Sequence, residues 1–219
     1  MSKYKYVLLD MDGTIVNTEP SVVHCVLHVA KTMGYDIPPV SEQKTWIGPP
    51  LTDTFIKSLK MPAEKTPEAM KIYREEYDKN AIFDCELYPG IPEAVKGLHE
   101  KGFKVSVASS KMERACDRIL NHFSLREYFD DVVGSDVNCS IETKEQVLKE
   151  FFSRHNDATL ENTVLVGDTY FDAEGAKLCG IDFIGVLYGF GDSESMGKYN
   201  PVVFFDNISD AVDYIYNKK

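Results

Sequence analysis

Two aspartates near the start of the chain have the side chains that metal and phosphate chemistry needs. Asp10 and Asp12 are separated by one residue and are followed directly by Gly13 and Thr14. Two carboxylates this close repel each other unless they share a proton or a cation. Carboxylate oxygens and a backbone carbonyl suit Mg²⁺, which also bridges to substrate phosphate. We therefore expect Asp10 and Asp12 to belong to a magnesium site.

The residues before Asp10 indicate how such a site is positioned. Residues 7–9 are apolar without alternation, as in a parallel strand that is buried on both faces. Ligands of an open parallel sheet bind beyond the carboxyl ends of its strands, so Asp10 and Asp12 are expected at that edge. Gly13 allows the chain to turn sharply there.

A second strand end carries hydroxyl groups. Ser109 follows an apolar strand expected over residues 103–108, and Ser110 and the start of a helix come next. A hydroxyl group combined with the amides of a helix start makes a site for phosphate oxygens. The same serine could instead cap the helix without any contact with a ligand.

A third strand end carries two more acids. Asp168 follows an apolar strand at residues 163–166, and Asp172 comes one helical turn later. The pair could serve only to cap and stabilise the start of the helix. A glycine-rich stretch at residues 185–191 lacks the spacing of a dinucleotide-binding motif, and we expect it to be a loop after a strand.

Together these residues resemble the motifs of the haloacid dehalogenase-like hydrolase superfamily, most of whose members are Mg²⁺-dependent phosphatases. The stretch from Asp10 to Thr14 looks like the first motif, and Ser109 is similar to the second. The Gly-Asp-x-x-x-Asp stretch that ends at Asp172 looks like the fourth. The resemblance spans nearly the whole chain and points to the phosphoglycolate phosphatase-like branch.

The resemblance implies a role for each motif. Asp10 would be the nucleophile that forms an aspartyl-phosphate, and Asp12 the general acid and base. Mg²⁺ would bind Asp10, the backbone carbonyl of Asp12 and Asp168, while Asp172 would hold metal-bound water or a neighbouring backbone group. Ser109 is expected to be a catalytic residue that holds charge on the phosphate, and the residues expected to bind substrate in the core are Thr14 and Ser110.

The third motif of the superfamily is a lysine that neutralises phosphate and steadies the nucleophile, often within a Lys-Pro pair. This chain contains no Lys-Pro pair. Lys144 is the preferred candidate, because it begins a helix, where a cation is otherwise unfavourable for the helix dipole. Lys111, two residues after Ser109, is the alternative.

Strands alternate with helices in the second part of the chain, which predicts an α/β fold with a doubly wound parallel sheet. Residues 15–84 instead show helical periodicity and no convincing strand. We therefore expect a core domain of residues 1–14 and 85–219 and a small all-helical insertion of residues 15–84. The insertion resembles the cap that many members of the superfamily carry after their first motif.

One turn of this insertion contains Trp46, Gly48 and two prolines. It resembles the cap loop of phosphoglycolate phosphatase-like enzymes, which faces the active site, and it predicts that Trp46 and Gly48 contact the leaving group. The turn could equally be a plain connection between helices.

Composition narrows the choice of partners. The net charge of −11 argues against nucleic acid, and no apolar run approaches the ~18 residues of a membrane span. The five scattered cysteines are typical of reduced thiols in a cytoplasmic protein. We expect a monomer or weak homodimer that binds a small phosphate ester.

The resulting hypothesis is a Mg²⁺-dependent phosphomonoester hydrolase. A haloacid dehalogenase is disfavoured because that class lacks the acid at the position of Asp12. A phosphosugar mutase of the β-phosphoglucomutase type would keep every core residue, and a non-catalytic phosphate-binding module is a third reading. Phosphoglycolate, nucleoside monophosphates and sugar phosphates all remain open as substrates.

Overall fold

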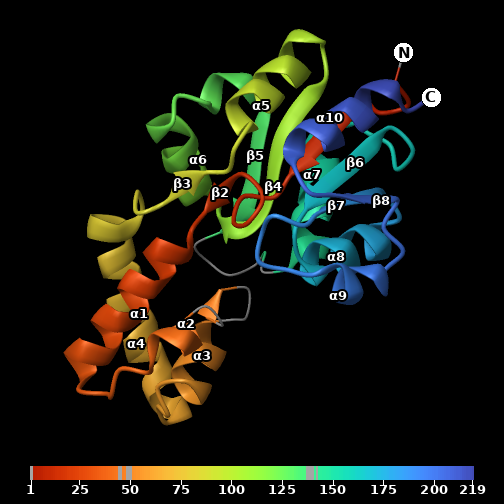
Figure 1. The fold of residues 1–219 in the computed structure, drawn as a ribbon. Coiled ribbons are helices and arrows are strands. Elements are labelled where there is room, and N and C mark those ends of the chain that lie inside the picture. The colour runs from red at the N-terminus through yellow and green to blue at the C-terminus, as the bar shows by residue number, and fades with distance from the viewer. Residues whose placement is uncertain (1, 44–45, 48–50, 137–140, 142) are drawn as a thin grey trace. The chain divides into compact units, whose positions relative to one another are not determined.

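The computed structural model describes residues 2–43, 46–47, 51–136, 141 and 143–219. The chain forms two compact units, whose elements are labelled in Figure 1. The core unit comprises Met1–Asn17 and Leu87–Lys219, and the helical unit comprises Thr18–Glu86. Within the described residues, no helix combines the length and the apolar character that a membrane crossing requires.

A parallel sheet forms the centre of the core unit. Its described strands lie in the order β5-β4-β1-β6-β7-β8, and every adjacent pair is parallel. The strands are β1 (Tyr6–Leu9), β4 (Lys104–Met112), β5 (Asp131–Ser135), β6 (Thr163–Gly167), β7 (Asp182–Val186) and β8 (Val203–Phe205). The chain moves outward from β1 in one direction to β5 and in the other to β8. This reversal confirms the predicted doubly wound α/β fold.

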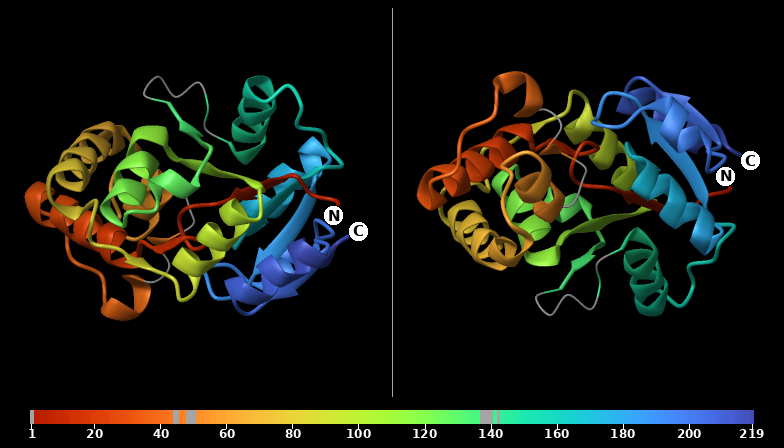
Figure 2. Two further views of the ribbon diagram at one scale, coloured as in Figure 1. Left: turned by 90° about the horizontal axis from the view of Figure 1, so that it is seen from above. Right: turned by 90° about the horizontal axis from the view of Figure 1, so that it is seen from below.

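Helices pack on this sheet in two groups. One group has α5 against α10, and the other has α7 against α8 and α8 against α9. Right-handed crossovers place helices on opposite faces when the direction of strand addition reverses, as it does here after β5. The helices are α5 (Ile91–Glu100), α6 (Glu113–His122), α7 (Lys144–Arg154), α8 (Tyr170–Cys179), α9 (Ser193–Gly197) and α10 (Ile208–Asn217). Both chain ends lie side by side in Figure 2, where the Lys3 amide donates to the Lys218 carbonyl at 2.6 Å.

Apolar packing between sheet and helices fixes the start of α7 and α8. Side chains of β1, β4 and β6 on the sheet face that α7 and α8 cover pack against both helices. The buried cluster includes Leu8, Ala108, Val147, Leu148, Phe151, Leu165, Ala173 and Ala176. Burial of a large apolar side chain contributes about 1.5–3 kcal/mol, so this cluster holds the two helix starts firmly against the strand ends.

The chain passes between the two units twice, through a short ladder. β2 (Val16–Asn17) and β3 (Glu86–Leu87) pair as a two-stranded sheet. We expected only helices in residues 15–84, so the short strand β2 is a correction. A two-residue strand is set by its partner 70 residues away, and periodicity cannot reveal it.

The helical unit has a core of its own and confirms the predicted helical insertion. Its elements are α1 (Glu19–Met33), α2 (Val40–Gln43), α3 (Leu51–Lys57), a 3₁₀ turn η2 (Ala63–Lys65), α4 (Thr66–Glu76) and a π-helical turn η3 (Tyr77–Ala81). Pro20 and Pro67 lie in the first turns of α1 and α4, where a missing amide donor costs nothing. The buried core includes Cys25, Val26, Val29, Phe55, Leu59, Met61, Ala69 and Tyr73.

Trp46 belongs to this same core, and its position corrects a prediction. We predicted that its ring would contact the leaving group of the substrate. The side chain is 1% exposed and packs in the apolar cluster of the helical unit, so it has no surface to offer to a ligand. The bulk and apolarity of an indole favour this burial over exposure in a turn. Gly48, predicted for the same role, lies outside the described residues.

His24 links three segments of the helical unit. From α1, its Nδ1 lies 2.8 Å from Asp84 Oδ2 and its Nε2 lies 2.9 Å from Glu76 Oε1 at the end of α4. His28 Nδ1 lies 3.6 Å from the other Glu76 oxygen. The hydrogen bond that His24 donates to Glu76, opposed by partial burial and helped by the hydrogen bond to Asp84, raises the pKa of His24 above its usual range.

This raised pKa makes the stability of the helical unit depend on pH. A histidine whose folded pKa exceeds its unfolded value of about 6.5 stabilises the fold fully below that value. The contribution disappears as the pH rises through the folded pKa. We expect the thermal stability of the wild-type protein to fall slightly as the pH rises across this window. The stability of His24→Gln should not show this fall. His99→Gln, in α5, is the matched control and should keep it, and an unchanged pH profile in His24→Gln would contradict the assignment.

Candidate active site

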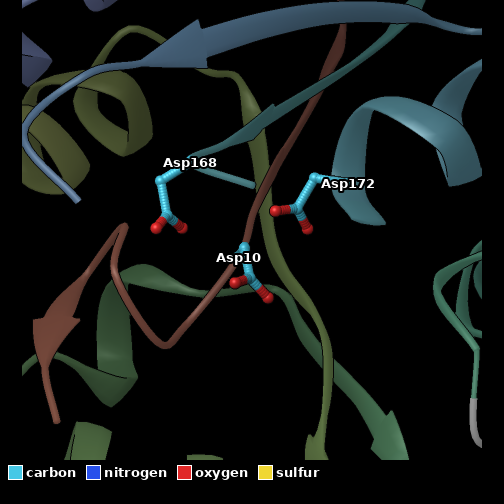
Figure 3. Close-up of side chains that lie close together, drawn as sticks. All are labelled: Asp10, Asp168 and Asp172. Carbon is cyan, nitrogen blue, oxygen red and sulfur yellow. The ribbon is translucent and has the colours of Figure 1, made fainter. Parts of the chain in front are cut away.

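Three acidic side chains meet at the carboxyl ends of neighbouring strands. Asp10 follows β1, Asp168 follows β6, and Asp172 lies in the first turn of α8. Figure 3 shows the three side chains close together, and each offers a carboxylate oxygen within 4.8 Å of the others. β1 and β6 pair in register, and the Asp10 amide donates to the Val166 carbonyl at 3.0 Å. Strand pairing therefore brings together two acids that are far apart in sequence.

Lys144 is buried beside two of these acids, Asp10 and Asp172. Its Nζ lies 2.6 Å from Asp10 Oδ1, 2.7 Å from Asp172 Oδ1 and 2.7 Å from the Ala108 carbonyl. An ammonium group has three donors, and these contacts use all three. α8 contributes room as well, because a Cβ at Gly175 would lie 2.7 Å from the Lys144 Cβ.

A capping box places Lys144 at the first position of α7. The Thr143 hydroxyl accepts from the Gln146 amide, and the Gln146 side chain accepts from the Thr143 amide. This reciprocal arrangement satisfies two amides that would otherwise lack partners at the helix start. The helix therefore begins where its first side chain can reach the ends of β1 and β4.

Among the described residues, Lys144 offsets only part of the negative charge of the three acids. Burial, opposed by Lys144 and reinforced by Asp172, raises the pKa of Asp10 to about 6. Burial and then the charges of Asp172 and Asp10 raise the pKa of Asp168 well above its ordinary value. Burial opposes the charge on Lys144, but Asp10 and Asp172 outweigh it and raise its pKa. Three carboxylates facing one ammonium need further positive charge, and all-oxygen donors fit a hard divalent cation.

Asp172 is held by two neighbours within the protein. Its Oδ1 contacts Lys144, while its Oδ2 accepts from the Thr169 amide at 3.0 Å and the Thr169 hydroxyl at 2.8 Å. A Cβ at Gly167 would lie 2.6 Å from the Asp172 carboxyl carbon, so the glycine makes room for the acid. These contacts lock Asp172 in place and let it orient Lys144.

Asp12 points to a different lysine. Its Oδ1 and Oδ2 lie 3.0 and 3.2 Å from Lys111 Nζ, and its side chain is 31% exposed. It is therefore more accessible than the buried side chains of Asp10 and Asp168. The two lysines that sequence alone could not separate are thus both at the site, Lys144 beside Asp10 and Lys111 beside Asp12.

The region around Ser109 differs from our prediction. We expected the strand to end at residue 108 and a helix to start just after the serines. β4 instead continues to Met112, with a shift of register against β5 between Ala108 and Met112, and α6 starts at Glu113. Irregularities of this kind reorient side chains and occur often beside active sites.

Ser109 and Ser110 consequently lie on a strand and not at a helix start. Ser109 is 2% exposed, and its hydroxyl accepts from the Lys111 amide at 3.2 Å. Ser110 is exposed. The helix-capping alternative is wrong, because the N-cap of α6 is Met112, which has no side-chain cap.

Thr14 is directed into the protein, which corrects its predicted contact with substrate. The side chain is fully buried, and its hydroxyl donates to Asp168 Oδ1 at 3.0 Å. Gly13 precedes it at φ +87°, where a Cβ would lie 2.1 Å from Asp168 Oδ2. The first motif therefore packs directly on the acid of the fourth.

A second contact to Asp168 was not predicted from the sequence. The glycine-rich stretch after β7, which we treated as a plain loop, approaches the acid so closely that the Phe190 amide donates to Asp168 Oδ2 at 2.8 Å. The position of this loop is the feature that could have indicated the contact. The loop follows β7, which is the neighbour of β6, so the loop starts at the same carboxyl edge of the sheet as Asp168.

These features define a doubly wound α/β protein with a helical insertion after its first strands and a buried acidic site at the point where the strand order reverses. The chain belongs to the haloacid dehalogenase-like hydrolase family, whose model matches residues 7–186.

Known proteins that resemble the chain over nearly its whole length include a nucleotidase and a phosphatase. A 5'-nucleotidase from Pseudomonas aeruginosa is 28% identical over 199 residues, covering 91% of this chain and 90% of the relative. A phosphoglycolate phosphatase from Photobacterium profundum is 23% identical over 219 residues, covering 96% and 95%. The fold matches a haloacid dehalogenase-like family protein from Streptococcus pneumoniae with a TM-score of 0.89 at 23% identity, covering 98% of this chain and 99% of that one.

Proposed function

We propose that this chain is a magnesium-dependent phosphomonoester hydrolase that acts on a small phosphorylated metabolite. The observation that carries the proposal is the buried cluster of Asp10, Asp168 and Asp172, in which Lys144 pairs with Asp10 and Asp172. Membership of the haloacid dehalogenase-like hydrolase family supports the reaction type. The names of the two relatives support a small phosphate ester as substrate.

In the proposed reaction Asp10 attacks phosphorus, and the bond to the leaving oxygen breaks as an aspartyl-phosphate forms. Asp12 protonates the leaving oxygen. It then takes a proton from a water molecule, which attacks phosphorus and breaks the bond to Asp10. The Asp12 carboxyl group thus serves both steps. Its partly exposed position beside Lys111 is compatible with contact to the leaving oxygen in the first step and to the attacking water in the second.

Other residues hold charge and geometry. Lys144 keeps the Asp10 carboxylate oriented and offsets part of the charge that develops on the phosphoryl oxygens. Ser109 and nearby amides would hold the remaining oxygens. Mg²⁺ would be held by Asp10, Asp168 and the backbone carbonyl of Asp12, and Asp172 would hold metal-bound water or a neighbouring backbone group. When bound, Mg²⁺ would supply charge that lowers the repulsion between the nucleophile and the phosphate.

Removal of metal should abolish the activity. We expect the enzyme to release phosphate from 4-nitrophenyl phosphate with Mg²⁺, to lose this activity in excess EDTA, and to recover it when Mg²⁺ is restored in excess. Three carboxylates lie at one site and Lys144 offsets only part of their charge, which gives the physical reason. Full turnover in metal-free enzyme would contradict the proposed site.

The physiological ester is a separate question that a substrate panel addresses. Phosphoglycolate, nucleoside monophosphates and sugar phosphates should be compared by their kcat/KM values for phosphate release. Sugar 1-phosphates should also be assayed for isomerisation. Isomerisation without release of phosphate would favour a mutase over a hydrolase.

A further inference from the structure

We propose that the loop of residues 187–191 positions Asp168 for metal binding, and that Tyr188 and Gly189 are its determining residues. This inference rests on the proposed function, because it assigns residues that set the metal affinity of the same site. The loop joins β7 to α9 and emerges beside the carboxyl end of β6.

Each oxygen of Asp168 has one fixed donor from the protein. Oδ1 accepts from the Thr14 hydroxyl at 3.0 Å, and Oδ2 accepts from the Phe190 amide at 2.8 Å. A carboxylate oxygen can accept two hydrogen bonds, so each keeps capacity for a cation. Donors of this kind orient a metal ligand, and their loss typically costs 10–100-fold in metal affinity.

Two glycines allow the loop to approach Asp168 this closely. A Cβ at Gly189 would lie 2.3 Å from Asp168 Oδ2 and 2.4 Å from the Gly13 carbonyl. A Cβ at Gly191 would lie 2.0 Å from the Asp168 carbonyl. Real side chains do not tolerate such distances, so any larger residue must displace the acid or the loop. The glycines therefore serve close packing against the acid.

Tyr188 fastens the loop to the first motif. Its hydroxyl donates to the Thr14 carbonyl at 2.9 Å, and its ring centroid lies 4.8 Å from that of Tyr88. Burial, reinforced by the charge of Asp168, raises the pKa of Tyr188, so its hydroxyl stays a donor. The Thr14 residue that Tyr188 holds is the one that donates to Asp168. Tyr188 thus fixes the backbone of one donor, and its own loop supplies the other.

The test measures metal binding directly, with Mn²⁺ as a paramagnetic probe, by titration under electron paramagnetic resonance. Tyr188→Phe removes only the hydroxyl, and Gly189→Ala adds only one methyl group. We expect the Kd for Mn²⁺ to rise about 10–100-fold in each. kcat at saturating Mg²⁺ and the KM for the phosphate ester should change far less than the Mg²⁺ requirement.

Tyr199→Phe is the matched control. Its hydroxyl contacts Glu174 on α8 at 3.2 Å, and Glu174 is not one of the groups that donate to Asp168, so Mn²⁺ affinity should not change. An unchanged Kd in Tyr188→Phe would overturn the inference, as would an equal rise in Tyr199→Phe. Because Tyr188→Phe is a mild change, it decides the question even if Gly189→Ala fails to fold.

The outcome also separates this inference from the proposed function. Weakened Mn²⁺ binding in the variants of a protein without phosphatase activity would uphold the positioning role and refute the hydrolase proposal. Normal Mn²⁺ binding in variants of an active phosphatase would do the reverse.

Discussion

Asp10→Asn is expected to abolish turnover of every phosphate ester. An amide in place of the carboxylate cannot form the acyl-phosphate, so the two-step route is closed. The fold should survive, because asparagine has nearly the same shape as aspartate. It also removes the electrostatic cost of a buried charge beside Asp172. Lys144 keeps its contacts with Asp172 and the Ala108 carbonyl. Steady-state release of phosphate and circular dichroism measure the two effects.

Asp182→Asn is the matched control for this experiment. It makes the same chemical change at the start of β7, where Asp182 contacts Lys3 and Tyr4 at the surface. Its kcat should equal that of wild type. Turnover close to wild type in Asp10→Asn would contradict the assignment of the nucleophile.

Asp12→Asn is expected to slow turnover by about 10²–10⁴, the usual contribution of general acid–base catalysis. The loss should depend on the leaving group. A good leaving group such as 4-nitrophenolate needs no proton, so formation of the intermediate should be nearly normal while its hydrolysis is slow. The leaving group of an alkyl phosphate needs the proton in the first step. With this substrate both formation and hydrolysis of the intermediate should be slow.

Pre-steady-state kinetics can check this distinction. With 4-nitrophenyl phosphate, Asp12→Asn should release a burst of nitrophenol and then react slowly. A variant that is as fast as wild type on alkyl phosphates would show that another group transfers the proton.

Asp10 and Asp168 could be predicted as site residues because each follows an apolar run that is best explained as a buried strand. Residues 7–9 and 163–166 are too apolar for an exposed edge, so they must be buried parallel strands, and Asp10 and Asp168 must follow them. Adjacency of the two strands then brings the acids together. Local sequence and a general rule on sheets suffice for this part.

Tertiary contacts decided what sequence could not. Nothing local shows that β4 runs past Ser109 to Met112, because this extension depends on its shifted pairing with β5. The choice between Lys111 and Lys144 depends on which strand end each side chain reaches. In the structure Lys144 contacts Asp10 and Lys111 contacts Asp12, and this arrangement of one lysine for each acid was not among the alternatives considered.

Thr14 and Trp46 illustrate another limit. Both were assigned to substrate from the motif or turn in which they occur, and both are buried against the protein's own residues. A hydroxyl group beside an acid and an indole beside prolines are equally compatible with packing and with binding. Only the direction of the side chain separates these readings, and sequence does not record it.

In the proposed mechanism Asp10 carries the phosphoryl group, and chemical trapping of the intermediate is the decisive test of this role. Asp12→Asn enzyme with Mg²⁺ and 4-nitrophenyl phosphate should be quenched during its burst, reduced with borohydride and digested. Reduction converts an aspartyl-phosphate to homoserine, which peptide mass spectrometry can locate. We expect homoserine at position 10, in proportion to the burst. A burst with homoserine at another position, or with none, would contradict it.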